Sequence, residues 1–365
     1  MSDAKSLIMV PAWAGQATVE ELAQEAHRGQ RPRTDYVELA KELDADVLDM
    51  DYMQNRSAPV ARALAKRAMV PAQVLEVFLR RGGPRHVVAR ADRMGLPLAL
   101  LNKITAGRRD VVLVSVWLSV KKKALFLHPL GVHSHLSAII NYGSVQMDHA
   151  RDYLRVPADK LHHALQPVDE RFFRPEDVPL GDYVCAVGSE ARDYKTFARA
   201  MSGVAARAEV AVGSSVLSLS GDPDETFRGI TRSAASAGEA GVKVHVQLDH
   251  RALRSLYARA RFVVVPLQDV DADCGVTVIA EAMAMGKAVV VSATRGQVDL
   301  VRHGNNGLYV PPGDAAALRA AVQRLLDEPE EAERMGKAGR ELVEQRLTLD
   351  GWVSHVASVT RTSAQ

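Results

Sequence analysis

The 365-residue sequence has very little cysteine, almost no net charge and no long hydrophobic run. Its two cysteines, Cys185 and Cys274, lie far apart in hydrophobic surroundings, so they form neither a disulfide framework nor a metal-ligand spacing. We expect both to be reduced thiols. With 46 basic against 44 acidic residues and a net charge of +2, no overall electrostatic field favours nucleic acid as a partner.

No apolar stretch reaches the roughly 18 residues that a membrane span requires. The first residues, MSDAKSLIMVPAW, contain one lysine and an apolar run that is too short for a signal peptide. These absences favour a cytoplasmic protein.

The length of the chain predicts two domains, because a typical domain needs roughly 100 to 200 residues. Residues 164–182 are rich in proline and acidic residues and interrupt the hydrophobic periodicity, as a linker does. We therefore predict an N-terminal domain over residues 1–168 and a C-terminal domain over residues 169–349. Apolar residues between Leu349 and Val359 form one helical stripe, and we expect a helix over 350–365 that packs back on the first domain.

Short β-branched runs alternate with helical patterns along the chain, which predicts an α/β fold with parallel sheets. In the first third we expect strands at 6–12, 47–50 and 86–91 and helices at 18–29, 35–45, 59–81 and 95–105. From Val111 onward we expect strands at 111–118, 137–143, 183–188, 216–221, 242–248, 261–267 and 288–293.

The most informative segment follows the predicted strand 261–267, where a polar loop leads into a helix that begins after Gly275. In a parallel sheet, such a loop opens the ligand crevice, and the helix N-terminus presents unpaired N–H groups to an anion. Gly275 allows close approach of the backbone, and the N–H groups of Val276 and Thr277 can point at phosphate oxygens. We predict a phosphate site here.

Glu281 lies in the same helix, among apolar and small residues where an unpartnered charge is costly to bury. A carboxylate at this place can accept two hydrogen bonds from the vicinal hydroxyls of a ribose. The alternative is that Glu281 lies on the wet face of the helix and contacts water.

Two further segments fit the same site. Gly188 ends a strand, and Arg192 and Lys195 follow it, as two cations that would stabilise a departing pyrophosphate. Such a pair is otherwise a solvated helix face. Val246 and Leu248 end another predicted strand, whose carboxyl end would face the same crevice, although core packing explains Val246 equally well.

These segments together resemble the nucleotide-binding core of the retaining glycosyltransferases of the GT-B type, the glycosyl transferases group 1. The matching residues are Pro266, Gly275, Glu281, Ala282, Met283, Ala284, Gly286, Lys287, Ala288, Gly304, Asn305, Gly307, Pro311, Pro312, Gly313 and Asp314. The resemblance implies a GT-B fold, in which two Rossmann-like domains face each other across a cleft.

The resemblance also implies roles for single residues. It assigns the ribose to Glu281, the diphosphate to Gly275–Thr277 with Arg192 and Lys195, and the nucleotide base to the strand end at Val246 and Leu248. Asp273 stands where the family has a second acidic residue that holds sugar hydroxyls, or it merely belongs to the loop.

The N-terminal domain matches the family poorly. Asp92 follows a strand at a cleft-facing position, and we predict a catalytic role for it beside Arg192, Lys195 and Asp273. The lysine run 121–123 is either a wet helix face or a contact to an acidic acceptor or membrane surface.

We therefore predict a glycosyltransferase that moves a sugar from a nucleotide-diphosphate sugar, most simply UDP- or GDP-linked, to an acceptor glycan, lipid or small molecule. Retention of configuration is implied by the resemblance alone. No cofactor, no metal and no nucleic acid are expected, and peripheral membrane contact and the oligomeric state stay open. The alternatives are a sugar-nucleotide epimerase of the same fold and a non-catalytic nucleotide-sugar-binding partner protein.

Overall fold

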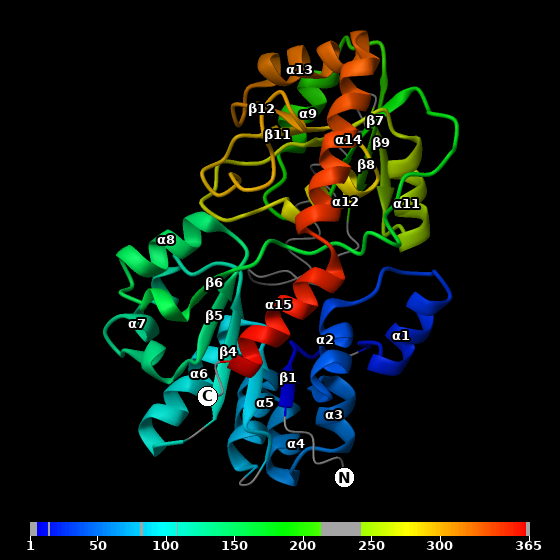
Figure 1. The fold of residues 1–365 in the computed structure, drawn as a ribbon. Coiled ribbons are helices and arrows are strands. Elements are labelled where there is room, and N and C mark those ends of the chain that lie inside the picture. The colour runs from blue at the N-terminus through cyan, green and yellow to red at the C-terminus, as the bar shows by residue number, and fades with distance from the viewer. Residues whose placement is uncertain (1–5, 14, 81–82, 108, 213–241, 363–365) are drawn as a thin grey trace. The chain divides into compact units, whose positions relative to one another are not determined.

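A computed structural model describes residues 6–13, 15–80, 83–107, 109–212 and 242–362. The chain forms two compact units (Figure 1). The N-terminal unit comprises Met1–Arg28, Arg33–Leu165 and Leu349–Gln365, and the C-terminal unit comprises Gly29–Pro32 and Gln166–Thr348. Each unit contains a six-stranded sheet in which the paired strands are parallel. The predicted α/β architecture is confirmed.

The N-terminal unit has the strand order β2-β1-β3-β4-β5-β6. Its strands are β1 (Ser6–Met9), β2 (Ala45–Leu48), β3 (His86–Ala89), β4 (Asp110–Ser115), β5 (Ala138–Asn141) and β6 (Leu161–His163). Its helices are α1 (Val19–His27), α2 (Asp35–Leu43), α3 (Met50–Asn55), α4 (Pro59–Ala65), α5 (Met69–Leu79), α6 (Asp92–Thr105), α7 (Lys121–Leu127), α8 (Ser144–Asp152) and α15 (Leu349–Thr362), with 3₁₀ turns η1 (Val132–His135) and η2 (Ala158–Lys160).

Both faces of this sheet are covered, which is why its central strands are almost entirely apolar. One face packs against α3 to α8, and the other packs against α2 and α15, which lie side by side in Figure 1. Trp352 and Val356 of α15 are buried against the sheet. The guanidinium of Arg90 lies 5.0 Å from the Trp352 ring centroid and pairs with Asp35, which fixes α15 to the end of β3.

The C-terminal unit has the strand order β9-β8-β7-β10-β11-β12. Its strands are β7 (Tyr183–Val187), β8 (Arg207–Val212), β9 (Val242–Val246), β10 (Val263–Val265), β11 (Val289–Ser292) and β12 (Gly307–Val310). Its helices are α9 (Tyr194–Met201), α11 (His250–Arg259), α12 (Val276–Ala284), α13 (Ala315–Asp327) and α14 (Pro329–Arg346). This is the order 3-2-1-4-5-6 of a dinucleotide-binding sheet, whose ligand crevice opens between its first and fourth strands, here β7 and β10.

The back of α12 is held by α14 at short range. A Cβ on Gly336 would lie 2.1 Å from the carbonyl oxygen of Gly286, and a Cβ on Gly339 would lie 2.9 Å from Cγ of Met283. Arg340 Nη1 donates a 2.8 Å hydrogen bond to the carbonyl of Ala284 at the end of α12. These contacts require glycine in α14 and leave the opposite end of α12 to face the crevice loops.

The structure differs from the expected elements in several places, and strands β6 and β12 are among those that were not expected. The single helix expected over 59–81 is two helices, α4 and α5, because Pro71 lacks an N–H and would clash with the carbonyl four residues earlier in a continuous helix. Strand β8 was not expected, since Arg207 and Glu209 weaken its hydrophobic pattern. The strand expected at 216–221 lies outside the described residues.

Candidate functional site

The loops that follow β7 and β10 are joined by their backbones, although they are far apart in sequence. Asp193 N donates to the carbonyl of Pro266 at 2.9 Å, and Gln268 N donates to that of Ala191 at 2.9 Å. Arg192 and Leu267 form a β-bridge between these two bonds. The two segments singled out from the sequence therefore form one rigid surface at the crevice.

Helix α12 begins at this surface with an uncapped N-terminus. Gly275 precedes it with φ +84°, and a Cβ there would lie 2.9 Å from Cγ1 of Val265, so both conformation and space require glycine. Among the residues that the structure describes, no side chain caps α12, whereas Asp193 caps α9. Thr277 in the first turn is exposed. The N–H groups and the positive end of the helix dipole are thus available to an anion.

Glu281 lies further along α12 and is partly exposed. Its Oε2 accepts a 2.9 Å hydrogen bond from the hydroxyl of Tyr257, a fully buried residue of α11. Burial raises the pKa of Glu281 to about 7, although the Tyr257 hydrogen bond and the charge of Arg192 act in the opposite direction. This carboxylate is therefore partly buried and has a protein partner.

Arg192 is buried, and its guanidinium folds back on its own loop. Nε donates to the carbonyl of Val187 at 2.8 Å, and Nη1 donates to that of Glu190 at 2.7 Å. The guanidinium occupies the space that a Cβ on Gly188 would need, which explains the glycine with φ +106°. Lys195 differs, because it lies exposed in the first turn of α9. The structure therefore brings the charge of Arg192 to the crevice in a fixed position and leaves that of Lys195 at the surface.

Asp273 is a buried carboxyl in the loop before α12, with 7% of its surface exposed. Its Oδ1 accepts a 3.0 Å hydrogen bond from Gln297 Nε2, and among the described residues Oδ2 has no partner. Burial and the nearby Asp299 raise the pKa of Asp273 to about 8, so it is largely protonated at neutral pH and can both donate and accept. The sequence pattern identified Asp273 but not Gln297, which lies 24 positions away.

Val246 and Leu248 lie at the carboxyl end of β9. Val246 is 48% exposed and Leu248 is half-buried, so Val246 does not belong to the core. Between them, Gln247 has φ +56° and donates its N–H to the carbonyl of Val212. This turn presents apolar side chains at the same end of the sheet as the loops that follow β7 and β10.

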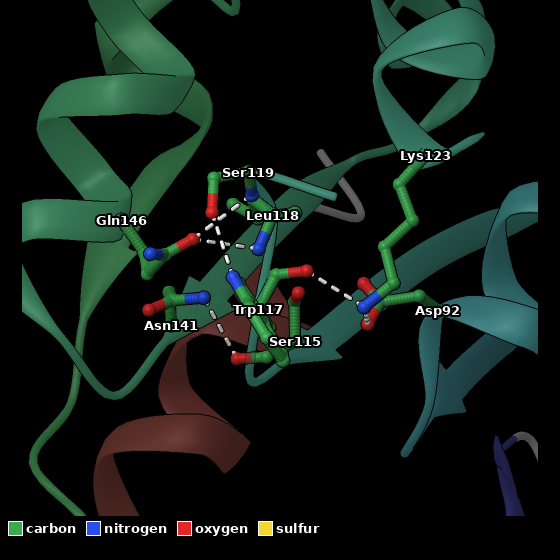
Figure 2. A network of polar contacts seen from close by, with 8 residues as sticks. All are labelled: Asp92, Ser115, Trp117, Leu118, Ser119, Lys123, Asn141 and Gln146. Carbon is green, nitrogen blue, oxygen red and sulfur yellow. Dashed lines mark hydrogen bonds and ion pairs between the residues drawn. The ribbon is translucent and has the colours of Figure 1, made fainter. Parts of the chain in front are cut away.

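Asp92 belongs to the N-terminal unit, in the first turn of α6 at the end of β3. It is buried and forms a 2.7 Å ion pair with Lys123, whose Nζ also donates to the carbonyl of Trp117 (Figure 2). Among the described residues the second carboxylate oxygen, Oδ1, has no partner. Lys121 and Lys122 are exposed as expected of a wet face, but Lys123 is not.

Two buried amides complete this network at the ends of β4 and β5. Gln146 Oε1 accepts from the backbone N–H groups of Leu118 and Ser119, and Asn141 Nδ2 donates to the carbonyl of Ser115 (Figure 2). The partners named here lie 26 to 28 residues away, in β4 and the loop that follows it, so the sequence did not reveal these contacts. The network fixes the loop after β4.

Neither a metal cluster nor a spanning segment was found in the part of the chain that the structure describes. In those residues, no group of three His, Cys, Asp or Glu side chains is arranged to hold a metal ion. No described helix is both long and apolar enough to cross a membrane.

Comparison with known proteins shows similarity over part of the chain. Residues 189–342 match the family model described as "Glycosyl transferases group 1". The chain is 37% identical over 113 residues to glycogen synthase of Mycobacterium tuberculosis, and 30% identical over 114 residues to alpha-D-kanosaminyltransferase of Streptomyces kanamyceticus. These alignments cover 31% of this chain, and only 26% and 29% of those two proteins. Residues 189–342 are thus similar to the glycosyl transferases group 1, the resemblance that the sequence predicted for this part of the chain.

Solved structures extend the likeness to the whole fold. Sucrose-phosphate synthase from Thermosynechococcus elongatus superposes with a TM-score of 0.71 at 17% identity, over 98% of each chain. Anabaena HepE, solved in complex with UDP and glucose, superposes with a TM-score of 0.69 at 15% identity, over 98% of this chain and all of that one. The protein has the GT-B glycosyltransferase fold, and the predicted resemblance is confirmed at this level.

Proposed function

We propose that the protein is a glycosyltransferase that moves a sugar from a UDP- or GDP-sugar to an acceptor glycan, lipid or small molecule. The observation that carries the proposal is the pairing, on α12, of an uncapped N-terminus with the partnered carboxylate of Glu281. Phosphate fits the first and vicinal ribose hydroxyls fit the second. The group 1 match of residues 189–342 supports this assignment.

The other donor contacts follow from the same placement. Val246 and Leu248 offer an apolar surface to the base, and Asp273 offers a protonated carboxyl to sugar hydroxyls. HepE, which shares the fold, has been solved in complex with UDP and in complex with UDP-glucose, which favours uridine over guanosine as the base.

Transfer breaks the bond between the sugar's anomeric carbon and the diphosphate oxygen, and it forms a bond from that carbon to an acceptor oxygen, whose proton is released. The diphosphate departs with additional negative charge. In this proposal the α12 N-terminus, Arg192 and the exposed Lys195 stabilise that charge, so a divalent metal is not required. Retention of configuration rests on the resemblance to group 1 enzymes. We assign Asp92 to the acceptor side, where its unpaired Oδ1 would accept a hydrogen bond from an acceptor hydroxyl.

We also propose that the protein acts in the cytoplasm. Both cysteines are free thiols buried in the C-terminal unit, which is the state that a reducing compartment maintains.

A nucleotide and product survey tests the function. Binding of UDP, GDP and ADP would be measured by thermal shift and calorimetry, since a ligand of the folded state raises the melting temperature. The cognate sugar nucleotide is then incubated with and without an acceptor panel. Acceptor-dependent release of nucleotide diphosphate supports a transferase. An isomerised donor formed without acceptor indicates an epimerase, and tight binding with no turnover indicates a non-catalytic binding protein.

A further inference from the structure

The turn that leads into α12 is held by a side chain from another loop. Gln297, which follows β11, is only 1% exposed. Its Nε2 donates 3.0 Å hydrogen bonds both to Oδ1 of Asp273 and to the carbonyl oxygen of Cys274. A single amide thus bridges the two residues that immediately precede Gly275.

The loop that carries Gln297 is itself fixed. The hydroxyl of Tyr309 donates a 2.7 Å hydrogen bond to the carbonyl of Gln297. A Cβ on Gly296 would lie 2.2 Å from the carbonyl oxygen of Ala272, so the two loops touch backbone to backbone. The backbone that carries the Gln297 amide is therefore held in place.

Removing this amide leaves polar groups without partners. Oδ2 of Asp273 is buried and has no partner among the described residues. The other oxygen, Oδ1, accepts the hydrogen bond from Gln297. A buried carboxyl and a buried carbonyl that lose their donor are destabilised in their present positions and drive the turn to rearrange. A rearranged turn would first displace the N–H groups of Val276 and Thr277, the first two residues of α12 after Gly275.

We propose that Gln297 is a positioning residue for the donor diphosphate, acting through the Asp273–Gly275 turn that directs the N-terminus of α12. This inference rests on the proposed function, because it requires that a diphosphate binds at this turn. Gln297 does not touch the diphosphate in this proposal. Its effect is therefore confined to the phosphate end of the ligand.

The test compares a nucleoside diphosphate with its parent nucleoside. Three variants are made: Gln297→Ala, Gln297→Met, which keeps the side-chain size but removes the donor, and the control Val298→Ala in the same loop at a residue that is 50% exposed. The affinity for UDP or GDP, whichever the wild type binds, is measured by calorimetry. The affinity for uridine or guanosine is measured by NMR titration, and melting temperatures are recorded for every protein.

We expect both Gln297 variants to bind the diphosphate about tenfold more weakly, as the loss of hydrogen bonds to a buried carboxyl predicts. Nucleoside affinity should stay within about twofold, and Val298→Ala should change neither value. If the wild type binds neither diphosphate, the proposed function fails and this inference falls with it. If the wild type binds but the Gln297 variants match Val298→Ala, only the positioning role is overturned. An equal loss for diphosphate and nucleoside also overturns it, because that is a general loss of structure.

Discussion

Glu281 offers the sharpest prediction, because its carboxyl titrates within the range in which binding is easily measured. Burial raises its pKa to about 7. If only the ionised carboxylate accepts the ribose hydroxyls, about nine tenths of the protein is competent at about pH 8 and about one tenth at about pH 6. The affinity of the wild type for UDP should therefore fall about tenfold over this interval.

The variant Glu281→Gln keeps the side-chain size but has neither the charge nor the titration. At about pH 8 it should bind UDP about 1 to 3 kcal/mol more weakly, as the loss of a charged hydrogen-bond acceptor predicts. This gap to the wild type should shrink towards about pH 6. The terminal phosphate of UDP has its own pKa near about 6, but it affects both proteins alike, so calorimetry reads the difference between them.

Tyr257→Phe provides a matched control for the cause of the titration. The Tyr257 hydroxyl donates to Glu281 and lowers its pKa, so its removal should shift the pH profile of UDP binding towards higher pH. Equal affinities of wild type and Glu281→Gln across the range, with identical pH profiles, would refute the ribose assignment.

Four further predictions concern the remaining groups. Arg192→Ala and Lys195→Ala should lower turnover more than they raise the apparent KM for the donor, as steady-state kinetics would show. Arg192→Ala should also lower the melting temperature, because the Arg192 guanidinium holds the loop after β7. If both variants only raise KM, the two residues contribute to ground-state binding alone. A chelator such as EDTA should leave the rate largely unchanged, and activity that is lost and then restored by magnesium or manganese would contradict this. The pKa of Asp273 is raised from 3.8 to about 8, so the free energy of unfolding should fall as the pH rises between these values, by up to about 1.4 kcal/mol per pH unit. In urea denaturation, the free energy of unfolding of Asp273→Asn should depend less on pH than that of the wild type. Lys123→Ala should lower the free energy of unfolding, measured by urea denaturation, by about 2 kcal/mol. The loss is smaller than for a fully buried ion pair, because the Lys123 side chain is 26% exposed. The control Lys122→Ala, at an exposed residue, should not change the free energy of unfolding.

The sequence predicted those elements whose cause is local. The strands β10 and β11 are continuous valine runs, and α12 starts after a glycine at which only glycine fits, so pattern and structure coincide there. Strand β8 was missed because it carries Glu209, a buried acidic residue whose 2.7 Å partner, His245, comes from the neighbouring strand.

The site residues divide in the same way. The order of strand, loop and helix is local, and it allowed Glu281 and Gly275 to be placed on one helix. The bend of the Arg192 side chain onto its own backbone is a conformational choice that residue type does not reveal. The partners of Asp92 and Asp273, which are Lys123 and Gln297, come from segments distant in sequence, so only the folded chain brings each pair together.

The position of α15 has a consequence for synthesis on the ribosome. Trp352 and Val356 fill one face of the sheet whose first strand begins at Ser6, yet they are translated after every strand of the C-terminal unit. During translation the part of that face that α15 covers stays exposed, because its apolar strand residues are buried only after Leu349–Thr362 has been made. The half of the protein that is made first is therefore completed last, and a ribosome that stalls before Leu349 releases a chain with this surface exposed.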